Sequence, residues 1–465
     1  MNYFMKNRIL FSILLLALFL RLITLNQSLW LDEAAQVIES SRPFWQQFDI
    51  AADFHPPFYH LFLHFWLLGG SSEVWIRLPS VIFSLGSIVM TYLIGTRLAN
   101  KRTGVLASLF LTVSSYHVWY SQEARPYMLF VFLSLFATYL ILKSRWFWYT
   151  ILGIFAILTN YFTFFVFLSH LFYILFFQRK DIKNIIIALT IAAIIFWAWI
   201  PFFAQQLRVG LGGQFHGWTS VVSVANVSLI PSTFAKFILG KITVSNNISA
   251  SLVLIPEMAL FIISCLTFWR EKSGKILLSL FFTPFVAAVI ANAFIPVVAP
   301  QRLLFLLPLF YLILATWILK LRFRLLILGI LIIVTTSAIG LWQYYTNSYV
   351  QRENWRAAIS FIEKTETPKS VVLFAFPSPF APYLWYYKGN SPSFGIAPSF
   401  IVSDDDLLIL EEKISGKNTV YFFQYLTGLT DQKGMIRLYL STHSYEEKEI
   451  RDFPGVGFIY RYEKI

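Results

Sequence analysis

The sequence is poor in two things that a soluble protein of 465 residues usually has. Only 13% of its residues are charged, which is too few to cover the surface of a globular protein of this length. It has a single cysteine, Cys265, in an apolar run, so we expect neither an internal disulfide nor a thiolate metal site. What is abundant is apolar: 57% of the residues are hydrophobic. The composition therefore predicts a membrane protein.

Long apolar runs recur through the first three quarters of the chain, and their length of about 20 residues is that of a membrane-spanning helix. We predict eleven spans, at residues 8–25, 78–98, 103–119, 127–142, 146–160, 162–177, 184–204, 250–269, 276–295, 303–319 and 325–344. The apolar stretch 58–68 is too short to cross and is expected to be a helix in or on the outer leaflet. With an odd number of spans, the two termini lie on opposite sides.

The composition changes after Tyr344, where mixed charge and short strand-like runs replace the apolar runs. One helical stretch and two strand-like runs are predicted at residues 355–364, 371–376 and 419–425. We therefore expect an all-α polytopic membrane domain over residues 1–343, with a long first external loop at 26–77. Residues 344–465 are expected to form a small extracytoplasmic α/β domain.

The net charge of +13 is interpreted as an orientation signal and not as a sign of nucleic-acid binding. With eleven spans, one face of the membrane part collects most of its Lys and Arg residues, against only Asp181 and Glu271 as acidic residues. The positive-inside rule makes that face cytoplasmic. The N-terminus is then cytoplasmic, and the C-terminal domain lies on the other side.

Two acidic sites fall on the outer face. Asp32 and Glu33 follow the first span, and Glu123 lies beside Arg125 between two later spans. Ionisable groups are costly at membrane depth, so those at the mouths of membrane helices are candidates for function. Asp32 and Glu33 also open a helical pattern, where helix capping accounts for one or both of them. Capping does not account for Glu123, nor for His55 before two prolines in the first loop.

Four runs of residues carry a more specific pattern: Leu31-Asp32-Glu33, His55-Pro56-Pro57-Phe58-Tyr59, Arg77-Leu78-Pro79-Ser80 and Tyr120-Ser121-Gln122-Glu123-Ala124-Arg125-Pro126-Tyr127. Together they resemble the membrane glycosyltransferases of the GT-C fold. The resemblance is greatest to bacterial relatives of the dolichyl-phosphate-mannose protein mannosyltransferases (family 39 type), which include the lipid A aminoarabinose transferase. It extends from Asp32 to about Phe177, and more loosely to Pro300-Gln301-Arg302 and Asn354-Trp355-Arg356.

The resemblance implies a sugar donor carried on a polyprenyl phosphate, an acceptor outside the cytoplasm, and a multi-pass protein of the bacterial inner (plasma) membrane. It also implies that Asp32 is the catalytic base. His55 stands where the aminoarabinose branch has a lysine, and Glu123 stands where that branch has an aspartate. Because of these differences, the resemblance does not specify the sugar or the acceptor.

The chemistry of such a donor defines what the protein must supply. The polyprenyl phosphate is itself the leaving group, so neither a nucleotide nor ATP is needed, a divalent metal is a possible cofactor, and the protein must supply a base and positive charge. Asp32, with Glu33 and Glu123 as further catalytic candidates, would provide the carboxylates. Arg125 and Arg302 could contact the phosphate through two hydrogen bonds each.

The remaining candidates have alternatives of similar weight. Arg21 could add a third phosphate contact or extend to the membrane interface. Tyr127 is a candidate for substrate binding. His55 could bind phosphate, relay a proton, coordinate a divalent metal together with Glu123, or have a structural role.

The sequence thus predicts an enzyme that moves a hexosyl or pentosyl group from a lipid-phosphate donor to a glycan, lipid or protein hydroxyl of the cell envelope. A polysaccharide polymerase or ligase would share the location and substrates. A lipid-linked sugar transporter would be polytopic too, but it should carry its ionisable groups near mid-membrane and show repeated halves. A structural scaffold does not account for two acidic sites at one depth.

Overall fold

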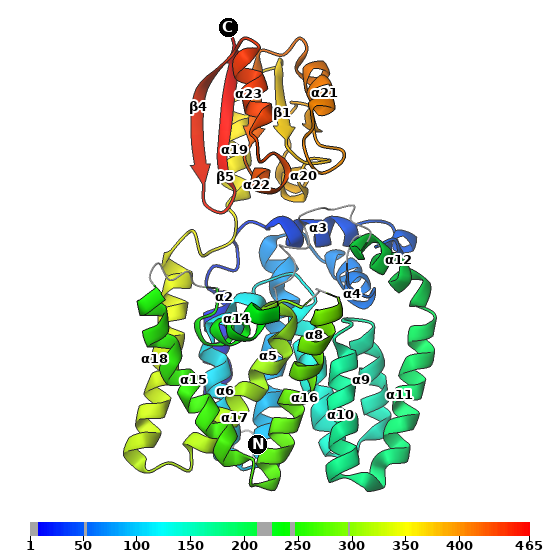
Figure 1. Cartoon of the computed structure of the whole chain (residues 1–465), viewed down its shortest axis with the longest axis vertical. Coiled ribbons are helices and arrows are strands. Elements are labelled where there is room, and N and C mark those ends of the chain that lie inside the picture. Colours follow the sequence, from blue (N-terminus) through cyan, green and yellow to red (C-terminus); the bar gives the residue numbers. More distant parts are fainter. Residues whose placement is uncertain (1–7, 51–53, 212–225, 242–246, 296–297) are drawn as a thin grey trace. The chain divides into compact units, whose positions relative to one another are not determined.

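The computed structural model describes residues 8–50, 54–211, 226–241, 247–295 and 298–465 (Figure 1). The chain divides into two compact units. The helical unit consists of the described parts of Met1–Leu25, Pro43–Gln206 and Val222–Thr346. The sheet unit consists of Asn26–Arg42, the described part of Leu207–Val221, and Asn347–Ile465. Each unit is described on its own.

The helical unit contains α-helices and three short 3-10 helices. Its first half has α2 (Arg8–Leu22), η1 (Phe44–Phe48), α4 (Phe58–Leu67), α5 (Glu73–Leu98), α6 (Lys101–Val113), α7 (Ser115–Ser121), α8 (Tyr127–Leu142), α9 (Trp146–Ile157) and α10 (Thr163–Phe177). Its second half has η2 (Arg179–Asp181), α11 (Ile182–Trp197), α12 (Ile200–Leu211), α14 (Asn226–Leu239), α15 (Asn247–Phe268), α16 (Lys272–Phe294), η3 (Pro300–Leu306), α17 (Leu307–Ile318) and α18 (Phe323–Thr346).

Every predicted span coincides with one helix or with two consecutive helices. The predicted short helix at 58–68 is α4. Two spans are broken: residues 103–119 divide into α6 and α7 at Ser114, and α11 meets α12 at an angle of 66°. Helices in the described residues were expected from the apolar runs, because a run without polar interruption satisfies its backbone groups most simply as a helix.

Among the described residues, four helices are long and apolar enough to cross a membrane: α5, α16, α18 and the continuous pair η3–α17. The bent pair α11–α12 makes a fifth if it is one span. Others are apolar but short. α9, for example, has 12 residues, which corresponds to about 18 Å of helix, against about 30 Å of hydrocarbon. The membrane fold is therefore supported, while the count of eleven crossings stays a prediction.

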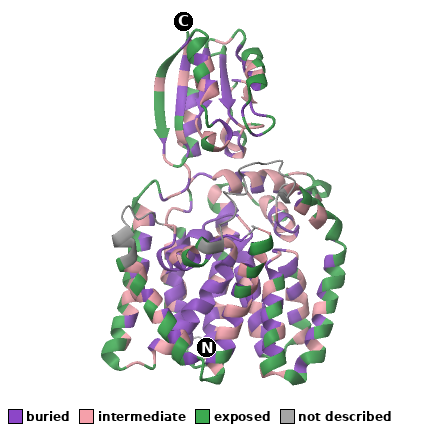
Figure 2. Ribbon diagram, in the orientation of Figure 1, coloured by how far each residue is buried: buried purple, intermediate pink, exposed green. Residues whose placement is uncertain are grey.

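The interior of the helical unit is formed around α17, most of whose residues are buried, while the outer helices expose apolar side chains (Figure 2). α5 and α6 approach closely at Gly104, where an added Cβ would lie 2.4 Å from the carbonyl oxygen of Tyr92. Only glycine fits this contact. Exposed apolar residues such as Phe19, Trp197 and Phe294 are the ones that a bilayer would cover.

The sheet unit contains α3 (Leu31–Ser40), α19 (Trp355–Thr365), β1 (Ser370–Phe374), α20 (Ala381–Tyr386), β2 (Ser393–Gly395), α21 (Asp404–Ile414), β3 (Thr419–Phe423), α22 (Thr427–Thr430), α23 (Met435–Thr442), β4 (Tyr445–Phe453) and β5 (Gly457–Lys464). The strand order is β2-β1-β3-β5-β4. β1 is parallel to both β2 and β3, and β5 is antiparallel to β3 and β4. The helical stretch and both strand-like runs predicted in the sequence are α19, β1 and β3.

Each face of this sheet carries its own apolar core, because alternate residues of β1 point to opposite faces. Val371 and Leu373 pack with residues of α21 and α23, whereas Val372 and Phe374 pack with residues of α19 and α20. Leu31 of α3 packs against the second of these cores. The helix that carries Asp32 and Glu33 is thus part of the same compact unit as the C-terminal domain.

Candidate active site

The first turn of α3 carries the acidic pair, as the sequence predicted, but its two carboxylates have different surroundings. Glu33 is fully buried, and its carboxylate accepts the backbone N–H of Trp30 at 3.5 Å, across the start of the helix. Asp32 is only partly buried, and within the described residues its carboxylate makes no hydrogen bond. Glu33 therefore has the contact of a capping residue. The carboxylate oxygens of Asp32 can still accept a hydrogen bond from a substrate.

A carboxylate from the far end of the chain holds the start of α3 in place. Oε2 of Glu353 accepts the backbone N–H of Leu31 at 3.2 Å and the indole N–H of Trp355 at 2.6 Å. Its Oε1 accepts the hydroxyl of Tyr425 at 2.7 Å. The hydroxyl of Ser28 donates to the backbone carbonyl of Glu353 at 2.5 Å. These bonds join the segment before α3 to α19 and to the loop after β3.

The surroundings of Glu353 change its acidity. Burial raises its pKa and outweighs the hydrogen bonds from Trp355, Tyr425 and Leu31, while the negative charge of Asp32 raises the pKa further, to about 7. Although the residue keeps some exposed surface, its carboxylate oxygens are surrounded by protein donors. Glu353 therefore changes its protonation state near neutral pH, next to the candidate base.

In the helical unit, Glu123 lies in the turn between α7 and α8. It is 1% exposed, and its backbone carbonyl accepts the hydroxyl of Ser80 from α5 at 2.5 Å. The preceding Gln122 donates its amide to the carbonyls of Arg21 and Ile23, at 2.8 and 2.5 Å. A side-chain amide therefore fixes the turn that carries Glu123 to the end of α2.

His55 and Tyr127 come together beside this turn. His55 is 6% exposed and its ring lies edge-to-face against that of Tyr127, with 6.1 Å between ring centroids. The backbone carbonyl of His55 accepts the side-chain amide of Gln206 at 3.0 Å. The ring of Tyr127 also packs edge-to-face on Tyr120, at 5.1 Å. The structure thus brings these two predicted site residues together, and Tyr127 follows Glu123 closely in the sequence.

The three candidate arginines differ in exposure. Arg125 and Arg302 are partly exposed; Arg302 lies in the 3-10 helix η3, where its backbone N–H donates to Ala299 at 2.9 Å. Arg21 is fully buried, and its guanidinium donates to the carbonyl of Ala17 at 2.9 Å and to Nδ1 of His117 at 2.7 Å. These bonds give Arg21 a role inside the helical unit, and a contact with phosphate remains a prediction.

The described residues provide few ligands for a metal ion. Within the described residues, no group of three or more His, Cys, Asp and Glu side chains could hold a metal ion. His55 and Glu123 alone are fewer than the three protein ligands of a typical catalytic zinc site.

Sequence reasoning missed Glu353, Tyr425, Gln122 and Gln206, although it singled out the adjacent Asn354-Trp355-Arg356 and the run that contains Gln122. Their roles depend on contacts with distant segments, which no local pattern reveals. The predicted site residues are divided between the units. Asp32 and Glu33 belong to the sheet unit, and the other six to the helical unit.

One family model matches the chain. Residues 54–204 match the model for dolichyl-phosphate-mannose-protein mannosyltransferase. This segment includes His55 and Glu123, begins after Asp32 and ends before Arg302. A comparison with curated protein sequences gave no match.

Solved structures share the fold along nearly the whole chain. ArnT from Cupriavidus metallidurans in the apo state has a TM-score of 0.60 and 11% identity, with 100% of this chain and 99% of that chain covered. The same enzyme bound to undecaprenyl phosphate has a TM-score of 0.58 and 12% identity, with 98% and 97% covered. The Archaeoglobus fulgidus oligosaccharyltransferase tethered to an acceptor peptide has a TM-score of 0.56 and 11% identity, with 99% of this chain and 74% of that chain covered. The resemblance seen in the sequence is thereby confirmed.

Proposed function

We propose that this chain, a GT-C fold membrane glycosyltransferase related to the dolichyl-phosphate-mannose protein mannosyltransferases and to ArnT, transfers a sugar from a polyprenyl phosphate to an extracytoplasmic acceptor. The observation that carries this reaction class is the family match over residues 54–204, which contains His55, Glu123 and Arg125. Two of the structurally similar enzymes were solved in complex with undecaprenyl phosphate or a dolichol-phosphate, which supports a lipid-phosphate donor.

The proposed step needs one base and one stabilised leaving group. The acceptor oxygen bonds to the anomeric carbon, the bond from that carbon to the phosphate oxygen breaks, and the lipid phosphate leaves with the electron pair. Asp32 takes the proton of the acceptor hydroxyl. Its partial exposure and its lack of a hydrogen bond within the described residues support this role, whereas Glu33 has the contact of a cap.

Positive charge is proposed for the departing phosphate. Arg125 and Arg302 would each offer a planar pair of donors, and both keep partial exposure in the helical unit. His55, Tyr127 and Glu123 would bind the donor beside them.

The sugar, hexosyl or pentosyl, and the acceptor, a glycan, lipid or protein hydroxyl, would be decided by pocket residues. The direct test uses purified, detergent-solubilised protein with envelope extract as the source of acceptor. Radiolabelled hexosyl and pentosyl polyprenyl phosphates are compared with the matching nucleotide sugars. Transfer of label and release of free polyprenyl phosphate are expected with a lipid-linked donor. Transfer from the nucleotide sugar alone would overturn the proposal.

We propose further that the N-terminus is cytoplasmic and the sheet unit extracytoplasmic, in a bacterial plasma membrane. The basis is the distribution of Lys and Arg between the two faces of the predicted membrane part. Reporter fusions at Arg145 and after Tyr344 should report opposite sides. The same side for both would remove the acidic sites from the outer face.

A further inference from the structure

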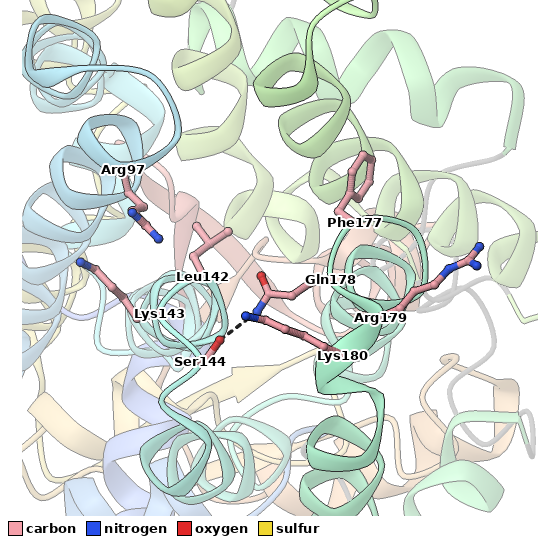
Figure 3. A pocket seen from close by; sticks show the side chains of 8 residues that line it. All are labelled: Arg97, Leu142, Lys143, Ser144, Phe177, Gln178, Arg179 and Lys180. Carbon is pink, nitrogen blue, oxygen red and sulfur yellow. Dashed lines mark hydrogen bonds between the residues drawn. The ribbon is translucent and has the colours of Figure 1, made fainter.

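A cavity of about 460 Å³ with basic walls lies where α5, α8 and α10 end (Figure 3). It is lined by Arg97, Leu142, Lys143, Ser144, Phe177, Gln178, Arg179 and Lys180. All of these residues belong to the helical unit. α8 starts at Tyr127, beside the candidate active site, and its 16 residues span about 24 Å before Leu142. The cavity is therefore separate from the site already described.

The ends of the helices explain why basic side chains gather there. Cations are favoured close to a helix C-terminus, where backbone carbonyls lack partners. Arg97 is in the last turn of α5 and Lys143 caps the end of α8. Ser144 then takes a positive φ of 53°, which turns the chain sharply, and the N–H groups of Ser144 and Arg145 donate to the carbonyls of Ile141 and Leu140.

Asp181 holds two polar residues that line the cavity, Ser144 and Gln178. Its carboxylate accepts the hydroxyl of Ser144 at 3.0 Å and the side-chain amide of Asn184 at 3.2 Å, together with the amide of Gln178. Burial alone would raise its pKa, but these hydrogen bonds and the charge of Lys180 lower it below the ordinary value. Asp181 therefore stays ionised and holds Ser144 and Gln178 in place.

The basic residues that line the cavity outnumber the acidic residue beside it, Asp181. Within the described residues, Arg97, Lys143 and Lys180 form no ion pair with a carboxylate within 4.0 Å. In Figure 3, Arg97 and Lys143 lie on one side of the cavity, while Arg179 points away from it. Consistent with this, Nε of Arg179 donates to the backbone carbonyl of Leu175 at 2.9 Å.

We propose that this cavity binds a phosphate group, with the headgroup of an anionic phospholipid as its source. A phosphate would accept hydrogen bonds from Arg97, Lys143 and Lys180, which line the cavity from three separate segments. A phospholipid headgroup is the form of phosphate that the end of a membrane helix meets. The site does not depend on the proposed reaction.

The test measures lipid binding to the delipidated full-length protein by native mass spectrometry. The probes are dioctanoyl phosphatidylglycerol, dioctanoyl phosphatidylcholine and inorganic phosphate. One phosphatidylglycerol is expected to bind about tenfold more tightly than phosphatidylcholine. The double variant Arg97→Gln/Lys143→Gln should lose this preference. Because both side chains are exposed, the variant should fold, which its thermal unfolding will verify.

The matched control is Arg102→Gln/Arg324→Gln, which removes the same charge from two exposed residues of the same predicted basic face, outside the cavity. It should bind phosphatidylglycerol as the unchanged protein does. Equal loss in both double variants would mean a diffuse attraction between charges and would overturn the site. If millimolar inorganic phosphate displaces phosphatidylglycerol, the cavity binds phosphate, but its ligand is a soluble phosphate and not a lipid headgroup. No preference for phosphatidylglycerol and no competition would exclude it.

Discussion

The two acidic regions of this chain are held by different kinds of partner. At the start of α3, the backbone N–H of Leu31 donates to the side-chain carboxylate of Glu353, and the hydroxyl of Tyr425 and the indole of Trp355 share that carboxylate. In the turn before α8, the side chains of Gln122 and Ser80 donate to backbone carbonyls, and the hydroxyl of Tyr344 donates to Oε1 of Gln122 at 2.5 Å. Asp32 remains partly exposed, whereas Glu123 is 1% exposed.

The residues to which we assign the base and the donor contacts belong to different units. The candidate base is carried by the sheet unit, where a titratable group positions it. The candidate donor-binding residues are carried by the helical unit, where the side chains of Gln122 and Ser80, which do not titrate, help to hold the turn. A change of pH should therefore affect the first region more than the second.

The largest effect is expected for Asp32→Asn. Loss of a general base typically lowers turnover by about 10²–10⁴-fold. The Asp32 carboxylate makes no hydrogen bond within the described residues, so α3 should persist in the variant. The measurement is transfer of radiolabelled sugar, together with the abundance of the purified protein. Unchanged turnover in this variant would rule out Asp32 as the catalytic base.

Arg302→Lys tests the donor side of the comparison. A lysine keeps the charge but not the pair of parallel hydrogen bonds, so a loss of about 1.5–3 kcal/mol in transition-state stabilisation is expected. The readout is kcat/KM for the lipid-linked donor. Arg324→Lys, at an exposed position of α18, is the control and should be silent. An equal effect of the two changes would argue against a phosphate contact at Arg302.

Glu353→Gln tests whether the stability of α3 depends on pH through Glu353. The folded pKa of Glu353, about 7, lies above the ordinary carboxyl value, so the stability it contributes is present at low pH and lost as the pH rises through 7. Glutamine resembles the protonated acid and should remove this dependence, which is about 1–3 kcal/mol. The measurement is amide hydrogen exchange of the full chain, corrected for intrinsic rates. In the unchanged protein, the amides of α3 should be less protected at pH 8 than at pH 5. In the Glu353→Gln variant, their protection should be the same at both pH values.

The turn that carries Glu123 provides the internal control for this experiment. Its protection should not change with the Glu353 substitution. A Glu353→Ala variant should weaken α3 at both pH values, since it leaves the donors of Trp355 and Tyr425 without their acceptor. Protection of α3 that is the same at both pH values in the unchanged protein would contradict the assigned role of Glu353.

The smallest effect is expected for Glu33→Gln. Gln can replace Glu at the third position of a capped helix, so the change should cost about 0.5–1 kcal/mol or less in helix stability. Transfer activity should be close to that of the unchanged protein. A loss as large as that of Asp32→Asn would reverse the roles assigned to the two neighbouring carboxylates.

Much of the local structure could be predicted from single segments. The apolar runs predicted the helices of the helical unit, and the runs around 371–376 and 419–425 predicted β1 and β3. The breaks were not predicted. An apolar run looks the same whether it forms one straight helix or two, and the angle of 66° between α11 and α12 depends on packing that the run does not encode.

By itself, the sequence determined the class of protein, the apolar helices, α19, β1 and β3, and the acidic and basic residues that became candidates, because these follow from composition and from neighbours along the chain. Only the tertiary structure decided that α3 belongs to the compact unit of the C-terminal domain, and that Glu353 holds it. Leu31 and Glu353 are 322 residues apart. A hydrogen bond across that separation forms only when the sheet unit folds and brings the two residues together. The local sequence around either residue therefore does not predict it.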